Sequence, residues 1–400
     1  PPDDCPFTSR PVVNNLVPVH DLSQEKFAVR YTPFRMERYQ STYEHRVRYN
    51  LSESGVHPLT VGELLEIAES DVSVDEIRLG YGQSNGSDGL RELIAQQYPG
   101  ATAASVLVTV GGAEANFTCF WHLFETEGNA AVVLPNYGQV PGLLESFRSR
   151  LSAVSLLEEN GWQPDLDALE HALANGARFV LVTNPNNPTG AALTRESMDA
   201  IAELTDKHGA WIMADEVYAG AENGDATTPS FWGCHDRVLI TNSLSKAYGL
   251  PGLRLGWIVG PSDLIGELWG RTDYTTIAPA NVSDALACVA LEPRTRARIL
   301  ERTRGIVRAN LGLVESWMAE QDGRFRYQAP DAGAICYARY DASINSTEFA
   351  EKLRIEKGVL VVPGDHFGMD HYLRIGFGNP EEELREALGL VREAFDEVTA

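Results

Sequence analysis

A single lysine, Lys246, stands between a short apolar run, VLIT (238–241), and a segment rich in glycine and proline, AYGLPGLRLG. The apolar run favours a buried β-strand, so the lysine falls at a strand end that is partly shielded from water. In such surroundings an amine loses its proton more easily, and it then forms a Schiff base with a carbonyl group. A surface lysine in an ordinary loop is the alternative that this run alone leaves open.

Four other apolar runs end in residues that suit a small ligand. The segments that follow them are GGAEANF (111–117), PNYGQ (135–139), NPNNPTG (184–190) and DEVYAG (215–220). Glycines at a helix start let backbone amides approach a phosphate. Tyr137 offers a ring to stack on a flat ligand, and Asn187 offers an amide to a ligand oxygen. Asp215 follows a wholly apolar strand, where an unpaired carboxylate is costly, so it needs a cationic partner such as a protonated ring nitrogen.

Taken singly, each of these segments also fits a plain turn or a core aromatic. Taken in this order, they offer a phosphate cradle, a stacking aromatic, an oxygen ligand, an acid for a ring nitrogen and an amine. Pyridoxal 5′-phosphate (PLP) presents the matching groups, which are a phosphate, a flat ring, a phenolic oxygen, a pyridine nitrogen and an aldehyde. The sequence therefore predicts a PLP site at the ends of several strands.

Positioning these groups needs a sheet whose strand ends meet. Apolar, β-branched runs typical of buried parallel strands occupy residues 106–110, 131–134, 179–183, 211–214, 238–241 and 256–260. Amphipathic helices are predicted between some of them, at 165–176 and 195–209. Strands that alternate with helices predict an α/β fold with a mostly parallel, doubly wound sheet. In such sheets ligands collect at the carboxyl ends of the strands.

The 400 residues are expected to divide into two domains. We assign residues 61–288 to a large PLP-binding domain and residues 289–400 to a smaller α+β domain. Residues 1–60 are expected to form an N-terminal arm and part of the small domain. The arm is rich in proline and asparagine through Leu22, which favours an extended course.

Outside the large domain, the pattern predicts a few further elements. A helix rich in Arg, Glu and Tyr is expected over 33–48, and a long charged helix is expected to begin at Pro293. Strands are predicted at 335–340 and 359–362, followed by a final helix over 381–398.

The composition narrows the function classes. The formal net charge of −23 argues against nucleic acid and against an anionic membrane surface as partners. No apolar run approaches the ~20 residues that span a bilayer. The five cysteines form no CxxC pair and the histidines form no HExxH motif, so neither a disulfide framework nor a metal site is expected. The first residues lack a signal-peptide pattern, which together with the cysteine usage favours the cytoplasm.

The motifs NPNNPTG, DEVY and SLSKAYGLPGLRLGW (243–257) resemble those of the class I and II aminotransferases, a family of PLP-dependent enzymes of fold type I. The resemblance runs from about residue 50 to the C-terminus and implies an aspartate-aminotransferase-like fold. It implies that Lys246 carries the cofactor as a Schiff base and shuttles the substrate proton. It also implies that Asp215 pairs with the pyridinium nitrogen, while Tyr218 and Asn187 bond the phenolic oxygen.

The same resemblance assigns the remaining site residues. Those implied to bind the phosphate are Gly112, Ala113, Ser243, Ser245 and Arg254. Tyr137 would stack on the ring, and Arg374 would bind the substrate α-carboxylate as a bidentate partner, with Asn187 beside it. Gly55 matches the substrate-side glycine loop of the family. Tyr81 matches the tyrosine that reaches the phosphate of the neighbouring subunit, which implies a homodimer with shared active sites.

Two activities follow from the resemblance. The favoured one is transfer of an amino group between an L-amino acid and a 2-oxo acid. The alternative is a lyase or cyclase that acts on a hydroxylated arginine-type amino acid in specialised metabolism. The loop SESGVHPLT (52–60) favours the alternative, because it replaces the usual GEPDF-like loop and is similar to that of a cyclase of the family. The acidic composition would also suit a cationic side chain. His57 in this loop is either a pocket residue or, more commonly for a lone histidine, a structural one.

Overall fold

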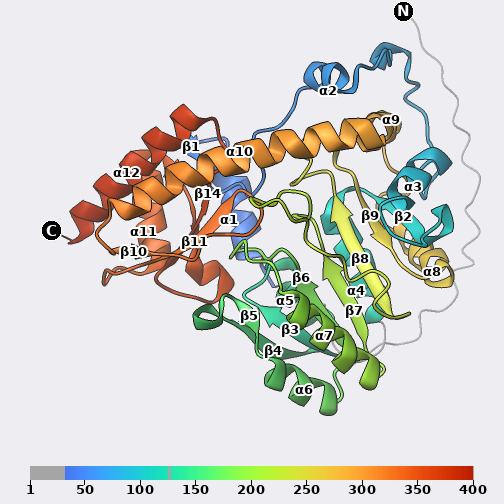
Figure 1. Ribbon diagram of the computed structural model, residues 1–400, viewed down its shortest axis with the longest axis horizontal. Coiled ribbons are helices and arrows are strands. Elements are labelled where there is room, and N and C mark those ends of the chain that lie inside the picture. Colours follow the sequence, from blue (N-terminus) through green and yellow to red (C-terminus); the bar gives the residue numbers. More distant parts are fainter. Residues whose placement is uncertain (1–31, 125–127, 400) are drawn as a thin grey trace, which may run out of the picture.

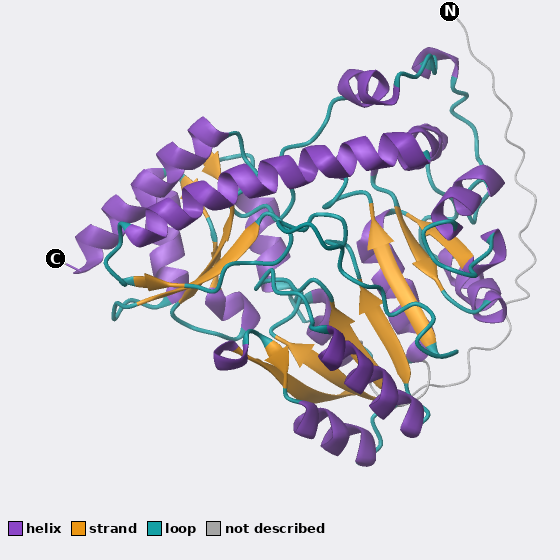
Figure 2. Cartoon of the chain, viewed as in Figure 1, coloured by secondary structure: helices purple, strands orange, loops and turns teal. Residues whose placement is uncertain are grey.

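The computed structural model describes residues 32–124 and 128–399, and the long helix α10 (Pro293–Ala319) runs along both of its parts (Figure 1). One part is built on a large twisted sheet with helices on both faces, and the other on a smaller sheet near the C-terminus (Figure 2). Separate apolar cores stabilise the two parts. The domain boundaries at residues 60 and 288 stay a prediction, and the arm through Leu22 lies outside the described residues.

The central sheet has eight strands in the order β2-β9-β8-β7-β6-β3-β4-β5. Their bounds are β2 (Val106–Thr109), β3 (Asn129–Leu134), β4 (Arg150–Leu157), β5 (Gln163–Pro164), β6 (Phe179–Thr183), β7 (Trp211–Asp215), β8 (Val238–Ser243) and β9 (Gly256–Val259). The five strands from β8 to β4 are parallel to one another, whereas β9 is antiparallel to both of its neighbours and β5 is antiparallel to β4. The prediction of a mostly parallel sheet is confirmed.

Helices cover both faces of this sheet because alternate strand residues point in opposite directions. In β6, Val180 and Val182 join one apolar core, whereas Leu181 joins the core on the other face. The helices that contribute to the first core include α3 (Asp88–Ala95), α6 (Leu166–Ala174), α7 (Arg195–Lys207) and α9 (Asn281–Leu291). Those that contribute to the second are α4 (Gly111–Leu123), α5 (Gln139–Ser146) and α8 (Ser262–Thr272). The fold is therefore a doubly wound α/β layer, as predicted.

The smaller part is an antiparallel sheet packed against helices. Its four strands are β10 (Phe325–Arg326), β11 (Ile335–Tyr340), β14 (Tyr372–Gly376) and β13 (Val362–Pro363), in that order. Its helices include α11 (Ser346–Lys352) and α12 (Glu381–Thr399). In α12, Leu384, Leu388, Val391 and Phe395 repeat at helical spacing and are buried in the core of this part. The final helix predicted from the sequence is confirmed.

Two expectations for this region need correction. The strand expected over 359–362 is two short strands, because β12 (Val359–Leu360) pairs with β1 (Tyr49–Asn50) and the chain then changes partner to form β13. The helix expected over 33–48 is shorter, since α1 covers only Arg35–Tyr43. The residues after it form a turn and a bend, and the amides of Arg48 and Tyr49 then donate to the Gly358 carbonyl.

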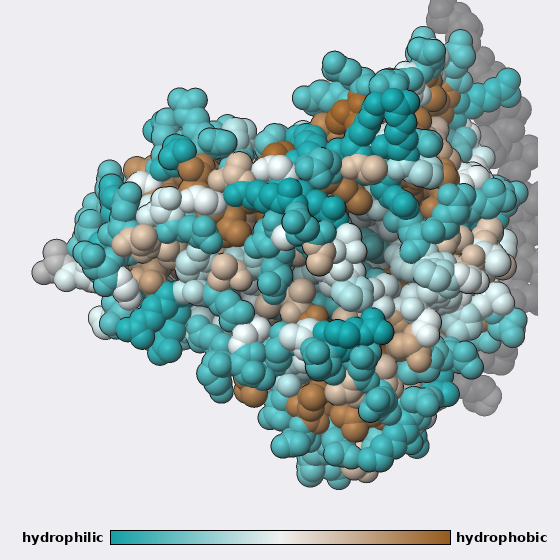
Figure 3. All heavy atoms as spheres, in the orientation of Figure 1, coloured by the Kyte–Doolittle hydropathy of each residue, from teal (hydrophilic) through white to brown (hydrophobic). Residues whose placement is uncertain are grey.

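The first described segments connect the two parts. Helix α1 lies between them, and α2 (Val61–Ala68) begins with a capping box in which Thr60 and Glu63 satisfy each other's backbone amides. Leu64 of α2 is buried in the core of the large part. The molecular face in Figure 3 is mostly hydrophilic, with apolar side chains in separate spots. Among the described residues, no helix combines the length and apolar character needed to cross a bilayer.

Candidate active site

A cavity of about 600 Å³ opens where the parallel strands end, between the two parts of the molecule. It is lined by every predicted site residue except Gly55 and Tyr81. These lining residues are Gly112, Ala113, Tyr137, Asn187, Asp215, Tyr218, Ser243, Ser245, Lys246, Arg254 and Arg374. They come from the ends of β2, β3, β6, β7 and β8 and from β14, so segments far apart in sequence converge as the topology requires.

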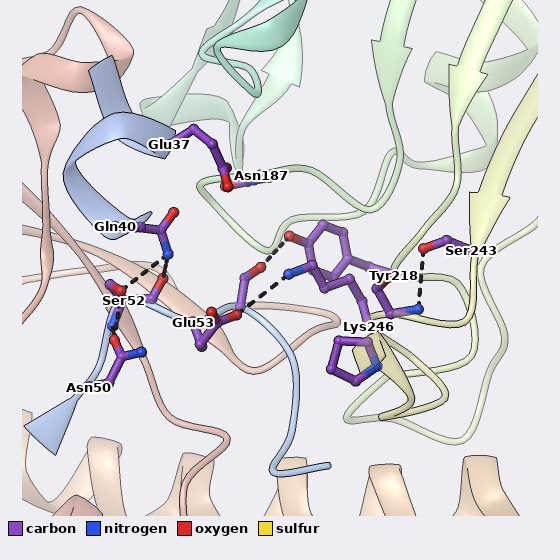
Figure 4. A network of polar contacts seen from close by, with 12 residues as sticks. Glu37, Gln40, Asn50, Ser52, Glu53, Asn187, Tyr218, Ser243 and Lys246 are labelled. Atoms are coloured by element: carbon purple, nitrogen blue, oxygen red, sulfur yellow. Dashed lines mark hydrogen bonds and ion pairs between the residues drawn. The ribbon is translucent and has the colours of Figure 1, made fainter. Parts of the chain in front are cut away.

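Lys246 enters this cavity from the turn that follows β8. The turn is held by a hydrogen bond from the Ser245 amide to the Ser243 hydroxyl over 3.2 Å. Gly249 then takes a positive φ of 62°, which reverses the chain. The Lys246 Nζ atom lies 3.7 Å from the Glu53 carboxylate (Figure 4). The lysine is therefore not a surface residue in an ordinary loop, because its amine lines a cavity and faces an acid.

Asp215, the last residue of β7, lies on the floor of the cavity. It accepts hydrogen bonds from the Asn116 side chain over 3.1 Å and from the Val217 amide over 3.2 Å. Burial raises the pKa of the Asp215 carboxyl, and these two hydrogen bonds and the charge of Lys246 counteract the increase. Among the described residues, both of these hydrogen bonds to the carboxyl come from neutral groups. A cationic nitrogen on the cavity side would complete its surroundings.

Tyr218 and Asn187 stand on the wall of the cavity nearest to Arg374. The Tyr218 hydroxyl donates to the Ser54 hydroxyl over 2.8 Å, and the Asn187 side-chain oxygen accepts from Arg374 Nη1 over 2.9 Å. Arg374 is only 1% exposed, and its Nη2 also donates to the Ser52 carbonyl. Burial lowers the pKa of its guanidinium. A buried guanidinium that lines a cavity is well placed for an anionic ligand group.

An anion cradle forms at the start of α4. Gly111 takes a φ of 80°, so a larger residue there would strain the backbone, and its Cβ atom would displace Arg254 Nη2, which would lie 2.5 Å away. Arg254 in turn approaches the Ser245 hydroxyl at 3.4 Å, and Gly112 packs on Ser243. The first amides of this 13-residue helix add their donors to the same place. The predicted phosphate residues are thus together.

Tyr137 lines the cavity, but its ring has other neighbours. Its hydroxyl donates to Glu37 over 3.2 Å, and its ring packs edge-on against Phe34 with the ring centroids 4.9 Å apart. Burial, followed by the charge of Glu37, raises the pKa of the Tyr137 phenol well above its usual value. Its role as the stacking ring stays a prediction.

Gly55 and Tyr81 lie outside the lining. A Cβ at Gly55 would come within 3.3 Å of the Ser245 carbonyl, so this glycine lets the loop pack on the backbone beside Lys246. Tyr81 is 90% exposed and lines a separate cavity of about 730 Å³ on the other side of Arg254. The pocket alternative for His57 is not supported, because its amide and its Nδ1 atom both contact the Gly378 carbonyl and the residue lies outside the site cavity.

Several residues of the site were not predicted from the sequence. They are Met36, Glu37, Gln40, Glu44, Glu53, Ser54 and Asn116. Glu37, Gln40 and Glu44 recur at helical spacing, which signals one polar face of α1. Asn116 is a polar residue in the otherwise apolar segment NFTCFW, which signals a buried hydrogen bond. Neither signal identifies the partner, because the partners come from distant segments.

The residues present fit PLP. The α4 start with Arg254 supplies donors for a phosphate, and Asp215 supplies a buried carboxyl that lacks a cationic hydrogen-bond partner among the described residues. On the cavity wall, Tyr218 offers its hydroxyl and Asn187 offers its side-chain amide, and Lys246 offers an amine. These groups match the phosphate, ring nitrogen, phenolic oxygen and aldehyde of the cofactor.

Known proteins share this sequence and architecture. Residues 58–391 match the family model described as aminotransferase class I and II. Capreomycidine synthase of Streptomyces vinaceus is 32% identical over 87% of this chain and 90% of its own length. Arginine–pyruvate transaminase of Pseudomonas aeruginosa is 29% identical over 79% of this chain and 83% of its own.

Solved structures agree with these relatives. A PLP-dependent aminotransferase from Streptococcus suis superposes with a TM-score of 0.86 at 28% identity, covering 92% of this chain and 99% of that protein. The PLP-dependent cyclase OrfR superposes with a TM-score of 0.84 at 26% identity, covering 92% and 98%. The expected fold, resemblance and cofactor are confirmed. The chain therefore belongs to the class I and II aminotransferase family of PLP-dependent enzymes.

Proposed function

We propose that this enzyme transfers an amino group between an L-amino acid and a 2-oxo acid. The observation that carries the proposal is the convergence of an amine, a buried carboxyl and a buried guanidinium on one cavity, namely Lys246, Asp215 and Arg374. Amino transfer needs a group that moves a proton at the substrate Cα, a group that keeps the cofactor electron-poor and a group that fixes the substrate carboxylate.

Each residue has a distinct task in this proposal. When bound, PLP draws electrons from the Cα atom of the amino acid attached to it. Asp215 holds the proton on the ring nitrogen, and Asn116 orients the Asp215 carboxylate. Arg374 binds the α-carboxylate through its planar pair of donors and so orients the Cα–H bond. Lys246 takes the proton from Cα, because its amine lies at the end of β8 and faces the cavity.

Transfer of isotopically labelled nitrogen tests the proposal. The PLP-loaded enzyme is incubated with a panel of amino acids labelled at the amino nitrogen, together with pyruvate or 2-oxoglutarate. We expect at least one member of the panel to pass its label to the acceptor, as measured by mass spectrometry. The proposal fails if no acceptor gains the label while the enzyme retains its bound cofactor.

A second candidate is dehydration and cyclisation of a hydroxylated arginine. The observation that favours it is the 32% identity with capreomycidine synthase over nine tenths of that enzyme. The loop SESGVHPLT, which carries Glu53 and Ser54 to the cavity, adds support. Incubation with hydroxyarginine distinguishes the two activities. A product that has lost water without formation of any 2-oxo acid supports the cyclase, whereas an oxo-acid product supports amino transfer.

We also propose that the active enzyme is a homodimer with shared sites. Tyr81 is almost fully exposed, as is the neighbouring Leu79, at 89%. Leu79 and Tyr81 line the second cavity, of which Arg254 forms one wall. A second copy that covers these side chains would bring its own Tyr81 to the phosphate residues. This arrangement makes each site depend on both subunits.

A further inference from the structure

We propose that Glu53, paired with Glu44, receives the cationic end of the substrate side chain, so that the enzyme selects amino acids with a guanidinium or ammonium group. This inference rests on the proposed reaction at an amino acid and adds the class of substrate. It is carried by the position of the two acids, by the charges that line the cavity and by the unsatisfied guanidinium atom of Arg374.

The two acids lie together on the wall opposite the strand ends. Glu53 belongs to the loop between β1 and α2, and Glu44 follows α1, yet the two carboxyl groups are near enough for the charge of Glu53 to raise the pKa of Glu44. Both residues line the same cavity as Lys246. Figure 4 shows Glu53 directed toward the Lys246 amine across this cavity. The charge of one carboxyl group in such a site disfavours the charge of the other.

The environment favours a charged Glu53. The Lys246 ammonium, and then Arg374, lower the pKa of the Glu53 carboxyl, whereas burial acts in the opposite direction. Burial and the charge of Glu53 raise the pKa of Glu44. Glu53 presents a carboxylate to the cavity.

Lys246 is not a lasting partner of this carboxylate, because its amine would join the cofactor before it takes the substrate proton. While the amine is joined to the cofactor, Arg374 remains as a cation that lowers the pKa of Glu53. Among the described lining residues, the other strong bases are Arg254 and Arg374, which face the predicted phosphate and the substrate carboxylate. A neutral side chain would leave the Glu53 carboxylate, whose side chain is 51% exposed, to water alone. A cationic side chain would pair with it.

A second observation points to a ligand in the same cavity. The Nε atom of Arg374 is buried and has no hydrogen-bond partner among the described residues, and the whole residue is 1% exposed. A substrate carboxylate on this guanidinium fixes one end of the amino acid. The remaining wall of the cavity is formed by α1 and by the loop that carries Glu53. Helix α1 presents Glu37 and Gln40 to the same cavity. Glu37 is already bonded to Tyr137, which leaves the Glu53–Glu44 pair for the substrate.

Matched pairs of amino acids test this assignment. Arginine is compared with citrulline, and lysine with norleucine, because the members of each pair have similar length but differ in side-chain charge. The dissociation constant of each is measured on the PLP-loaded protein by calorimetry and by the change in its visible absorbance. We expect at least one cationic member to bind about 10- to 100-fold more tightly than its neutral match.

Three variants identify the residues responsible. Glu53→Gln and Glu44→Gln should each bring the ratio between cationic and neutral amino acids close to one, whereas Glu53→Asp should retain part of it. Glu203→Gln removes the same charge from the exposed face of α7 and should leave the ratio unchanged. Retained visible absorbance confirms that each variant is folded and loaded.

Several outcomes would overturn the inference. It fails if the unmodified enzyme binds neutral and cationic members equally, or binds neither cationic amino acid. It also fails if Glu53→Gln and Glu44→Gln leave the ratio intact, or weaken both members of a pair equally. If a neutral amino acid donates its amino group well while cationic ones do not, the substrate class is wrong and the proposed reaction stands. If no amino acid donates its amino group, the proposed reaction is wrong.

Discussion

The Asn116 amide donates a hydrogen bond to Asp215 over 3.1 Å, and the Thr241 hydroxyl donates to the oxygen of the same amide over 2.7 Å. An ionised carboxylate only accepts hydrogen bonds, so the amide presents its NH2 group to Asp215 and its oxygen to the Thr241 hydroxyl. Helix α4, strand β7 and strand β8 each supply one member of this chain. The relationship gives Asp215 a fixed orientation and opposes the rise in its pKa that burial causes.

Removal of this hydrogen bond should alter the pH dependence of the reaction. In Asn116→Ala the Asp215 carboxylate loses a donor that favours its charged form, so its pKa rises further. Activity that needs the carboxylate then appears only at higher pH. We expect the acidic limb of the kcat profile to move upward and kcat at neutral pH to fall about tenfold, since a hydrogen bond to a charged group contributes about 1.5–3 kcal/mol. An unchanged profile would contradict this role.

Replacement of Arg374 should impair recognition of the substrate carboxylate. Arg374→Lys keeps the charge but loses the planar pair of donors, so KM should rise about 100-fold with a smaller effect on kcat, which corresponds to about 2.7 kcal/mol. Steady-state kinetics with varied amino acid measures the effect. The visible absorbance of the loaded variant is the control for folding, because Arg374 is buried. A KM close to that of the unmodified enzyme would refute the assignment.

Glu216 should make the stability depend on pH. It follows Asp215, is 3% exposed, and accepts hydrogen bonds from the Phe231 amide and the Ser230 hydroxyl, each over 2.9 Å. Burial raises its pKa from 4.5 to about 8. The folded protein therefore binds this proton more tightly than the unfolded chain does. The contribution to stability is fully present below about pH 4.5 and is lost as the pH rises through about 8.

Urea denaturation at several pH values measures this effect. The free energy of unfolding of the unmodified protein, minus that of Glu216→Gln, should fall by about 1.4 kcal/mol per pH unit between these limits. Glu203→Gln serves as the surface control, and its difference from the unmodified protein should be flat. A flat difference for Glu216→Gln as well would mean that the carboxyl is ionised throughout this range.

Mixed subunits test the shared site. In the proposed dimer, Lys246 and the phosphate-binding Tyr81 of one site come from different subunits. Lys246→Ala and Tyr81→Phe should each lower activity when pure, the second through weaker binding of the cofactor. A mixture that is unfolded and refolded together should regain activity, because some dimers then hold one intact site. The shared-site proposal fails if the mixture only averages the two variants.

The strand ends of the site could be predicted from the sequence because each apolar run is followed directly by its polar group. Lys246, Asp215 and Asn187 are of this kind, and the parallel order of the strands then brings them together. The glycines near the phosphate residues also carry a local signal, since Gly111 needs a positive φ. At these positions the local sequence is enough to predict where the residue lies in the folded protein.

The remaining wall of the cavity could not be predicted in this way. Glu53 and Glu44 meet only because α1 and the loop after β1 fold back across the strand ends, which no local pattern specifies. The Asn116–Asp215 bond joins residues 99 positions apart. Strand β4 was not predicted because buried and exposed residues alternate irregularly along it, so it lacks the continuous apolar run that marks the wholly buried β2. Long-range packing decides all three features.

A single-turnover reaction tests the central claim most directly. The PLP-loaded enzyme is mixed with each amino acid of a panel without any 2-oxo acid, and both the cofactor and the substrate are identified by mass spectrometry. Amino transfer predicts that at least one amino acid converts the cofactor to pyridoxamine phosphate and yields an equal amount of its 2-oxo acid, with no conversion in Lys246→Ala. If the cofactor stays in the pyridoxal form with every amino acid, the proposed reaction is contradicted.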